Sequence, residues 1–261
     1  MAHRIAFGKN KGGTGNTTSV VRTAEALAKK GKRVGVVDMD PQGNASRRLG
    51  WVDDPEKLTV SEAIEEAADG VAAQVWQPIG WDAPYAGNIT LMPARFELEN
   101  RAREAGQTGA YRRLVKALRG ADDHLDYVLF DCQPSFGHLT EMAVAAAHYA
   151  VGTTEPEYDS LEAVIRWRDF VKTSREDLGN PSIELVGVVV TSYDQRLSAH
   201  TGQLKNCRTI FGDQVWGVVP QRSLMINADE FALPLSEVAD SSEMRAVYEL
   251  LAQRLMKEIP A

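Results

Sequence analysis

Cysteine is scarce in this chain of 261 residues, which contains only Cys132 and Cys207. Two cysteines are too few for a disulfide framework or a zinc cluster, so we expect both to be reduced residues that pack in the core. The chain also lacks any run approaching the ~20 apolar residues of a membrane span. Its N-terminus enters an apolar segment at once, without a signal-peptide pattern. The sequence therefore predicts a cytosolic protein.

Positive charge is also in deficit, because 29 Lys and Arg stand against 36 Asp and Glu and leave a formal net charge of −7. This balance excludes a protein that is basic all over, but it leaves room for a local basic patch. Internal repeats and low-complexity linkers are missing too. With 44% hydrophobic residues, a chain of this length supports a substantial core, and we predict one domain over residues 1–261.

Short apolar runs recur along the chain and are separated by helical stretches, at 4–7, 34–37, 89–92, 127–130, 186–190 and 216–219. Such runs predict buried parallel strands, and hence a doubly wound α/β fold. Several of them end at a polar or turn residue: Asp38, Asp131, Thr191 and Pro220. The carboxyl ends of parallel strands line one edge of a sheet, where ligands bind. Residues 51–88, with a helical pattern over 60–68, are expected to form a peripheral excursion.

The most informative segment is GKNKGGTGNTTS at residues 8–19. It follows an apolar strand and precedes a helical pattern, which is the context of a phosphate-binding loop. Gly12, Gly13 and Gly15 let backbone N–H groups approach an anion closely, Thr17 can present its hydroxyl to Mg²⁺, and Thr18 can reach another phosphate oxygen. Without that context, an ordinary glycine-rich turn would explain the segment equally well.

One position of the loop departs from the pattern G-x-x-x-x-G-K-[ST]: Asn16 stands in place of the phosphate-binding lysine. Losing a charge-assisted contact to phosphate costs about 1.5 to 3 kcal/mol, or roughly ten- to a hundredfold. We therefore expect hydrolysis to be impaired more than binding. An alternative is that Lys9, at the end of the first strand, supplies the missing charge. Against it, a strand-end lysine approaches from another direction and can simply snorkel to solvent.

Carboxylates accompany the loop at the ends of two other predicted strands. The second strand ends in VVDMDPQGN, where Asp38 and Asp40 point to the same side of an extended segment. Asp-Pro-Gln-Gly alone would be read as a turn or helix cap. The run 127–130 ends at Asp131, which has the Walker B form of an aspartate that holds Mg²⁺, usually through water.

Together, the segments KGGTGNTT, VVDMDPQGN and DYVLFDCQPS resemble the ParA/MinD family of deviant Walker A P-loop ATPases. The chain is more similar to short, Soj-like ParA partition proteins than to MinD. Later segments at 155–162, 187–194 and 219–222 resemble the family in the same order, so the resemblance covers nearly the whole chain. It implies a P-loop NTPase fold, ATP or ADP with Mg²⁺ as cofactors, ATP hydrolysis and a homodimer that sandwiches ATP.

The resemblance also implies roles for individual residues. Lys11 matches the signature lysine that reaches the partner's phosphates, Thr17 and Asp131 match the Mg²⁺ site, and Asp40 matches the aspartate that positions or activates the hydrolytic water. The catalytic set is Lys11, Asn16 and Asp40, and the metal set is Thr17, Asp40 and Asp131. The nucleotide-binding set is Lys11, Gly12, Gly13, Thr14, Gly15, Asn16, Thr17, Thr18, Tyr193, Asp194, Pro220 and Arg222.

ParA-like proteins bind DNA without sequence preference and act with a ParB-like centromere-binding protein, so the resemblance implies these partners and a nucleoid-associated location. The candidate DNA-binding residues are Arg196, Lys205, Arg208 and Arg222, with Arg254 and Lys257 beside them and a second strip at Arg166, Arg168, Lys172 and Arg175. Scattered solvated charge is the competing interpretation of each.

Two other functions remain open. The first is a nucleotide-dependent switch that does not hydrolyse ATP. The second, less favoured, is a MinD-like regulator that binds a membrane through its last helix. That helix carries Met244, Val247, Leu251 and Leu255 at helical spacing, which we interpret as core packing. No membrane partner is therefore expected.

Overall fold

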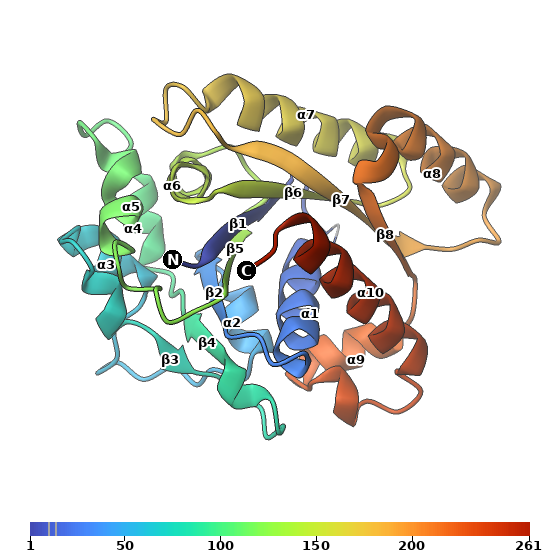
Figure 1. The fold of residues 1–261 in the computed structure, drawn as a ribbon, viewed down its shortest axis with the longest axis horizontal. Helices are drawn as coiled ribbons and strands as arrows, with labels where there is room; N and C mark the ends of the chain where they lie inside the picture. The colour runs from blue at the N-terminus through green and yellow to red at the C-terminus, as the bar shows by residue number, and fades with distance from the viewer. Residues whose placement is uncertain (10, 14) are drawn as a thin grey trace.

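The computed structural model describes residues 1–9, 11–13 and 15–261 and is built on an eight-stranded sheet with the order β3-β4-β2-β5-β1-β6-β7-β8 (Figure 1). Neighbouring strands pair in parallel, except that β3 runs antiparallel to β4. The strands are β1 (His3–Gly8), β2 (Val34–Met39), β3 (Gln77–Pro78), β4 (Ile89–Met92), β5 (Tyr127–Cys132), β6 (Tyr149–Thr154), β7 (Glu184–Tyr193) and β8 (Val215–Pro220). The predicted doubly wound, mostly parallel sheet is confirmed.

Helices cover both faces of this sheet. In Figure 1, α6, α7 and α8 lie on one side of it, and α1, α9 and α10 lie on the other. The α-helices are α1 (Asn16–Lys29), α2 (Asn44–Arg48), α3 (Val60–Glu66), α4 (Leu98–Ala102), α5 (Arg113–Ala117), α6 (His138–Ala146), α7 (Tyr158–Ser174), α8 (Ser198–Phe211), α9 (Leu224–Glu230) and α10 (Ser242–Glu258). Short 3₁₀ turns are η1 (Val71–Gln74), η2 (Ala86–Asn88), η3 (Ala110–Arg112), η4 (Gly212–Gln214) and η5 (Leu235–Glu237).

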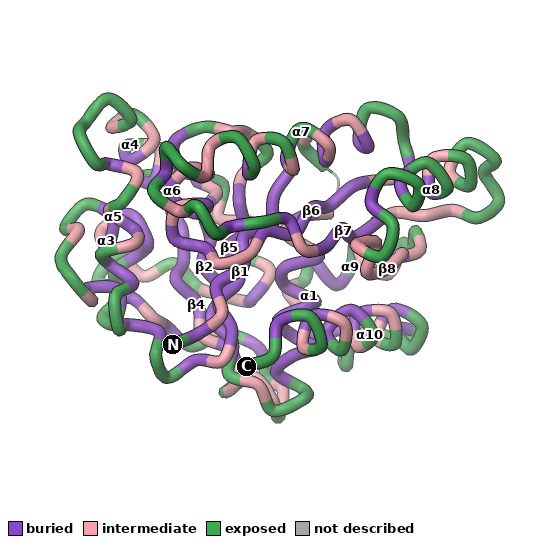
Figure 2. Tube along the Cα trace, turned by 45° about the horizontal axis from the view of Figure 1, so that its top comes forward, coloured by how far each residue is buried: buried purple, intermediate pink, exposed green. Residues whose placement is uncertain are grey.

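The alternation of side chains along each strand divides the core into two layers. On β1, Ile5 and Phe7 pack with residues of α1 and α10, whereas Ala6 packs with residues of α6 and α7 on the opposite face. The central strands are buried along almost their whole length, as the continuous purple trace in Figure 2 shows. Burial on both faces explains why these strands read as continuous apolar runs in the sequence.

All six apolar runs lie within strands, but two strands were not foreseen. β6 pairs with β1 at the centre of the sheet, and β3 adds an edge strand beyond β4. β3 belongs to residues 51–88, which contain α3 as the pattern predicted and also bury Val75 and Trp81 in the core. This excursion therefore contributes to packing.

Two packing predictions are also confirmed. Cys132 and Cys207 are buried and are not joined in a disulfide. On α10, Met244, Leu251 and Leu255 are buried against the sheet, as the core interpretation of that stripe expected. Among helices of the described residues, none combines the length and the apolar character needed to cross a membrane.

A buried ion pair attaches the segment after α5 to the central strand. Arg4 of β1 donates from Nε to Asp122 Oδ2 at 2.7 Å and from Nη2 to Asp122 Oδ1 at 2.9 Å. The same Nη2 also donates to the Leu118 carbonyl at 2.9 Å. Both side chains are almost fully buried. Removing one partner would therefore leave the other charge buried and unpaired, which destabilises the fold.

We therefore expect Asp122→Ala to lower the free energy of unfolding by about 3–5 kcal/mol. The exposed pair between Arg119 and Asp69 provides the matched control, and Asp69→Ala should cost less than about 1 kcal/mol. Urea denaturation followed by circular dichroism measures both values. Equal losses in the two variants would contradict the importance of the buried pair.

Candidate functional site

The glycine loop leaves the N-terminus of α1 open. Gly15 precedes α1 with φ 71°, and no side chain of the described residues caps the helix. The first-turn N–H groups therefore lack helical partners and point out of the helix end, where an anion can accept from them. Glycine is required at position 15, because its φ is positive and an added Cβ would lie 3.2 Å from the Thr191 side chain. Thr14, predicted to bind nucleotide, lies outside the described residues.

Two cavities lie on either side of this loop. The phosphate-loop cavity, of about 280 Å³, is lined by Lys9, Gly13, Gly15, Asn16, Thr17, Thr18, Asp40, Asn44, Arg48, Cys132 and Pro134. The large cavity, of about 640 Å³, shares the loop and Arg48 with it and extends to the ends of β7 and β8. A small anionic group fits the first cavity, and the second has the volume of an ordinary small-molecule site.

The side chain of Asn16 points into the protein. Its Nδ2 donates to the Phe7 carbonyl at 3.2 Å, to Asp131 Oδ1 at 2.8 Å and to the Cys132 carbonyl at 3.2 Å. Its Oδ1 accepts from the Thr153 hydroxyl at 3.1 Å. Asn16 thus links the carboxyl ends of β1, β5 and β6, and its two amide hydrogens are already used by protein oxygens.

Asp131 has an oxygen available for another ligand. The residue is buried at the end of β5, and its Oδ2 has no hydrogen-bond partner among the described residues. Burial raises the pKa of this carboxyl to about 6. Thr17 lines the adjacent phosphate-loop cavity. A hydroxyl and a buried carboxylate oxygen are suitable ligands, direct or through water, for Mg²⁺. Clusters of three or more His, Cys, Asp or Glu that could hold a metal do not occur within the described chain.

The two acids after β2 differ in their surroundings. Asp38 is fully buried, and its Oδ2 accepts from the backbone N–H of Ser46 at 2.8 Å and from the Ser46 hydroxyl at 2.7 Å. Burial raises the pKa of Asp38 to about 7. Asp40 is only partly buried and lines the phosphate-loop cavity, while its Oδ1 accepts from the Gln42 N–H at 3.0 Å. Asp38 therefore holds the start of α2, and Asp40 is the acid that faces the cavity.

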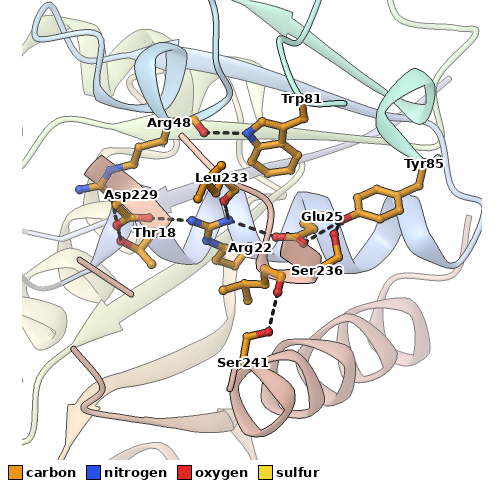
Figure 3. A network of polar contacts seen from close by, with 11 residues as sticks. Thr18, Arg22, Glu25, Arg48, Trp81, Tyr85, Asp229, Leu233, Ser236 and Ser241 are labelled. Atoms are coloured by element: carbon orange, nitrogen blue, oxygen red, sulfur yellow. Dashed lines mark hydrogen bonds and ion pairs between the residues drawn. The ribbon is translucent and has the colours of Figure 1, made fainter. Parts of the chain in front are cut away.

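A polar network connects the loop to α9 (Figure 3). The Thr18 hydroxyl donates to Asp229 Oδ2 at 2.7 Å and accepts from Arg48 Nη1 at 2.7 Å. Asp229 also forms ion pairs with Arg48 at 3.1 Å and with the fully buried Arg22 at 3.0 Å. Thr18 is therefore held by residues of α2 and α9, between the two cavities.

Lys11 lies against the start of α7. Its Nζ bonds to Glu157 Oε2 at 3.0 Å and to the Ser160 hydroxyl at 3.0 Å, at the start of α7. The hydrogen bond to Glu157 raises the pKa of Lys11. Of the described residues, Gly12 and Gly13 have open space around their α-carbons, so the backbone beside Lys11 is accessible.

The residues at and just after the ends of β7 and β8 line two neighbouring cavities. Pro220 and Arg222, which are predicted to bind nucleotide, line the large cavity. Tyr193 and Asp194 line a neighbouring cavity of about 390 Å³ that also includes Pro220 and Arg222. The structure thus brings these four residues to the same edge, with Tyr193 and Asp194 farther from the loop.

The candidate DNA-binding cations fall into paired and unpaired groups. Arg196 is paired with Asp194 at 2.7 Å, and Arg222 is paired with Glu243 at 2.8 Å. Lys205 and Arg208 are exposed on α8 and form no ion pair with any residue that the structure describes.

Sequence reasoning missed Asp229 and Arg48, which hold Thr18. Asp229 lies 211 residues beyond Thr18, and no local pattern signals that approach. Arg48 stands just after the acid-containing turn on α2, so its proximity to the loop could have suggested a role.

Several known proteins are similar to this chain in sequence or in fold. Residues 2–185 match the AAA domain family. The chain is 33% identical to the chromosome-partitioning ATPase Soj of Thermus thermophilus, over 98% of this chain and 96% of Soj. It is also 33% identical to the chromosome partitioning protein ParA of Caulobacter vibrioides, over 88% and 85% of the two chains. An ATP complex of Cyanothece McdA has the same fold, with a TM-score of 0.85 at 18% identity over 97% and 96% of the chains. The chain therefore belongs to the ParA/MinD family of deviant Walker A P-loop ATPases, among its Soj-like ParA members.

Proposed function

We propose that this chain is a one-domain ParA-like ATPase for plasmid or chromosome partition. It binds Mg-ATP in a sandwich homodimer, binds DNA without sequence preference in that state, and is released when a ParB-like centromere-binding protein stimulates hydrolysis. It works in the cytoplasm, on the nucleoid. The observation that carries the proposal is the uncapped N-terminus of α1 between the two cavities, next to the unpartnered oxygen of Asp131.

In this proposal, each group of residues in the site has its own role in phosphoryl transfer. Backbone N–H groups at Gly13, Gly15 and the first turn of α1 bind the phosphates. Thr17 and Asp131 would hold Mg²⁺, and a bound Mg²⁺ would supply positive charge to the phosphate oxygens. Asp40, which faces the phosphate-loop cavity, orients the attacking water. Lys11 leaves Glu157 and binds the phosphates of the partner subunit.

Hydrolysis is slow in this protein because Asn16 cannot supply a cation to the phosphates. Its amide hydrogens are bonded to protein oxygens, so the side chain contributes little to the negative charge that is stabilised in the transition state. The same observation favours a second candidate function, a switch in which ATP sets the dimer state without being hydrolysed. A MinD-like membrane role has less support, because the apolar stripe of α10 is buried.

The DNA-binding face is centred on Lys205 and Arg208. Both are exposed on one helix without a protein counter-ion among the described residues, whereas Arg196 and Arg222 are each paired with an acid. An unpaired cation is free to replace the counter-ions of phosphate, so it contributes more to nonspecific binding.

We expect Mg-ATP to bind with an affinity measurable by calorimetry. Asp40→Ala should keep the affinity of the unchanged protein within about threefold, because the phosphates are held by backbone donors, and should lose ATP turnover. The absence of binding heat at millimolar ATP would contradict a nucleotide site.

Asn16→Lys should raise the rate of ATP hydrolysis at least about tenfold, since it adds a cation next to the transferred phosphoryl group. Steady-state phosphate release measures the rate, and thermal unfolding checks that the lost hydrogen bonds of Asn16 are tolerated. Asp40→Ala in this background should abolish the gain. An unchanged rate in a folded Asn16→Lys protein would favour the switch function.

Replacing Lys205 and Arg208 together by Glu should weaken binding to random-sequence duplex DNA at least about tenfold and reduce its salt dependence. The matched control replaces Lys57 and Lys116 by Glu, which are also exposed and without an ion pair among the described residues, so the net charge changes equally. Fluorescence anisotropy with ATP, in the Asn16→Lys background, measures both. If the two double variants lose equal affinity, the DNA face lies elsewhere, and the strip at residues 166–175 is tested next.

A further inference from the structure

Lys9 is a largely buried residue whose ammonium has no hydrogen-bond partner among the described residues. It directly follows β1, and only 5% of the residue is exposed. Across residues 1–9, 11–13 and 15–261, its ammonium forms no hydrogen bond or ion pair. A buried charge is normally paired, because removing an ammonium from water carries a large desolvation penalty. The protein thus supplies no hydrogen-bonded anion to the Lys9 ammonium, and a bound anionic ligand could supply one.

The surroundings of Lys9 indicate where that anion binds. Lys9 lines the phosphate-loop cavity together with Gly13, Gly15 and Thr17, whose backbone and hydroxyl groups are the other anion- and metal-binding elements of the loop. Burial lowers the pKa of Lys9 to about 8, although the negative charges of Asp131, Glu155 and Asp40 act in the opposite direction. The side chain is thus mostly protonated at neutral pH.

The other cations near the loop already have protein partners. Arg48 lines the same cavity but is paired with Asp229 at 3.1 Å. Lys11 is paired with Glu157 at 3.0 Å. Asn16 is uncharged, and its amide is bonded to three protein oxygens. Among the described residues that line the phosphate-loop cavity, Lys9 is therefore the cation without an ion pair, and its charge is available to a ligand.

We propose that Lys9 binds the terminal phosphates of a nucleoside di- or triphosphate and so takes over the charge-neutralising role that Asn16 cannot perform. The proposal rests on the proposed function, because it requires the nucleotide to bind at the N-terminus of α1. It predicts that the loop binds phosphate without a lysine on the helix. Lys9 approaches from the end of β1 and not from α1, so ground-state binding is retained while turnover stays slow.

The competing role for Lys9 is structural, as a counter-charge to the neighbouring Asp131 and Asp40. The two roles predict opposite effects on the protein without nucleotide. Removal of a structural counter-charge would leave the acids unbalanced and lower the melting temperature. Removal of an unpartnered buried cation would relieve a desolvation cost and leave the melting temperature unchanged or higher.

The test compares Lys9→Met, a nearly isosteric uncharged variant, with the unchanged protein. Affinities for Mg-ATP and Mg-ADP are measured by calorimetry, and unfolding is followed without nucleotide. We expect both affinities to fall about ten- to a hundredfold, as for the loss of one charge-assisted phosphate contact, with no loss of melting temperature. The control is Lys30→Met at the far end of α1, where an exposed lysine is removed and affinity should not change.

A second variant moves the cation back to the helix. Lys9→Met combined with Asn16→Lys should recover ATP affinity to within about threefold of the unchanged protein, because the charge returns to the same cavity. Failure of this recovery, unchanged affinity in Lys9→Met, or a Lys9→Met protein that melts earlier or does not fold would each overturn the proposal. Absence of ATP binding by the unchanged protein would instead refute the proposed function, and this inference with it.

Discussion

Buried negative charge at the carboxyl edge of the sheet is the constraint on which the rest of this site depends. Asp38 and Asp131 lie opposite each other in the register of β2 and β5, and both are almost fully buried. Each needs donors or a cation nearby to remain ionised. Ser46 satisfies Asp38, whereas Asn16 satisfies only one oxygen of Asp131. The remaining oxygen explains why the site is suited to a metal ion next to an anion.

The position of Asn16 follows from the same constraint. An amide at the start of α1 can donate to Asp131 and to two strand-end carbonyls at once, so it joins the strands without adding charge. In the phosphate site that we propose, the helix end therefore relies on its backbone N–H groups and on cations from other elements. Thr18 is affected as well, because its hydroxyl is already shared between Asp229 and Arg48. A phosphate oxygen that binds Thr18 must compete with Asp229, which links phosphate binding to α9.

Much of the fold could be predicted from the sequence because its strands are buried on both faces. The runs that form β1, β2, β4, β5, β7 and β8 are mostly apolar. Parallel strands buried on both faces are recognised in a sequence by such continuous apolar runs. β6 was missed because its sequence, YAVGTT, has only a short apolar core between a tyrosine and two threonines. The loop, Asp40 and Asp131 were found from local motifs. The direction of the Asn16 side chain, the burial of Lys9 and the approach of Asp229 depend on packing between distant segments, which no local pattern encodes.

The contacts of Lys11 bear on the dimer that we propose, in which this lysine binds the phosphates of a partner. Lys11 follows the strand end and is held by Glu157 and Ser160 at the start of α7. This pair is partly exposed, so its contribution to stability is small and the lysine can be released at little cost. A partner's phosphates carry more negative charge than a single carboxylate, so they compete effectively for the same ammonium. The weak internal pair thus holds Lys11 in the single chain and is compatible with the transfer that we propose, in which Lys11 reaches a nucleotide bound by a second copy of the chain.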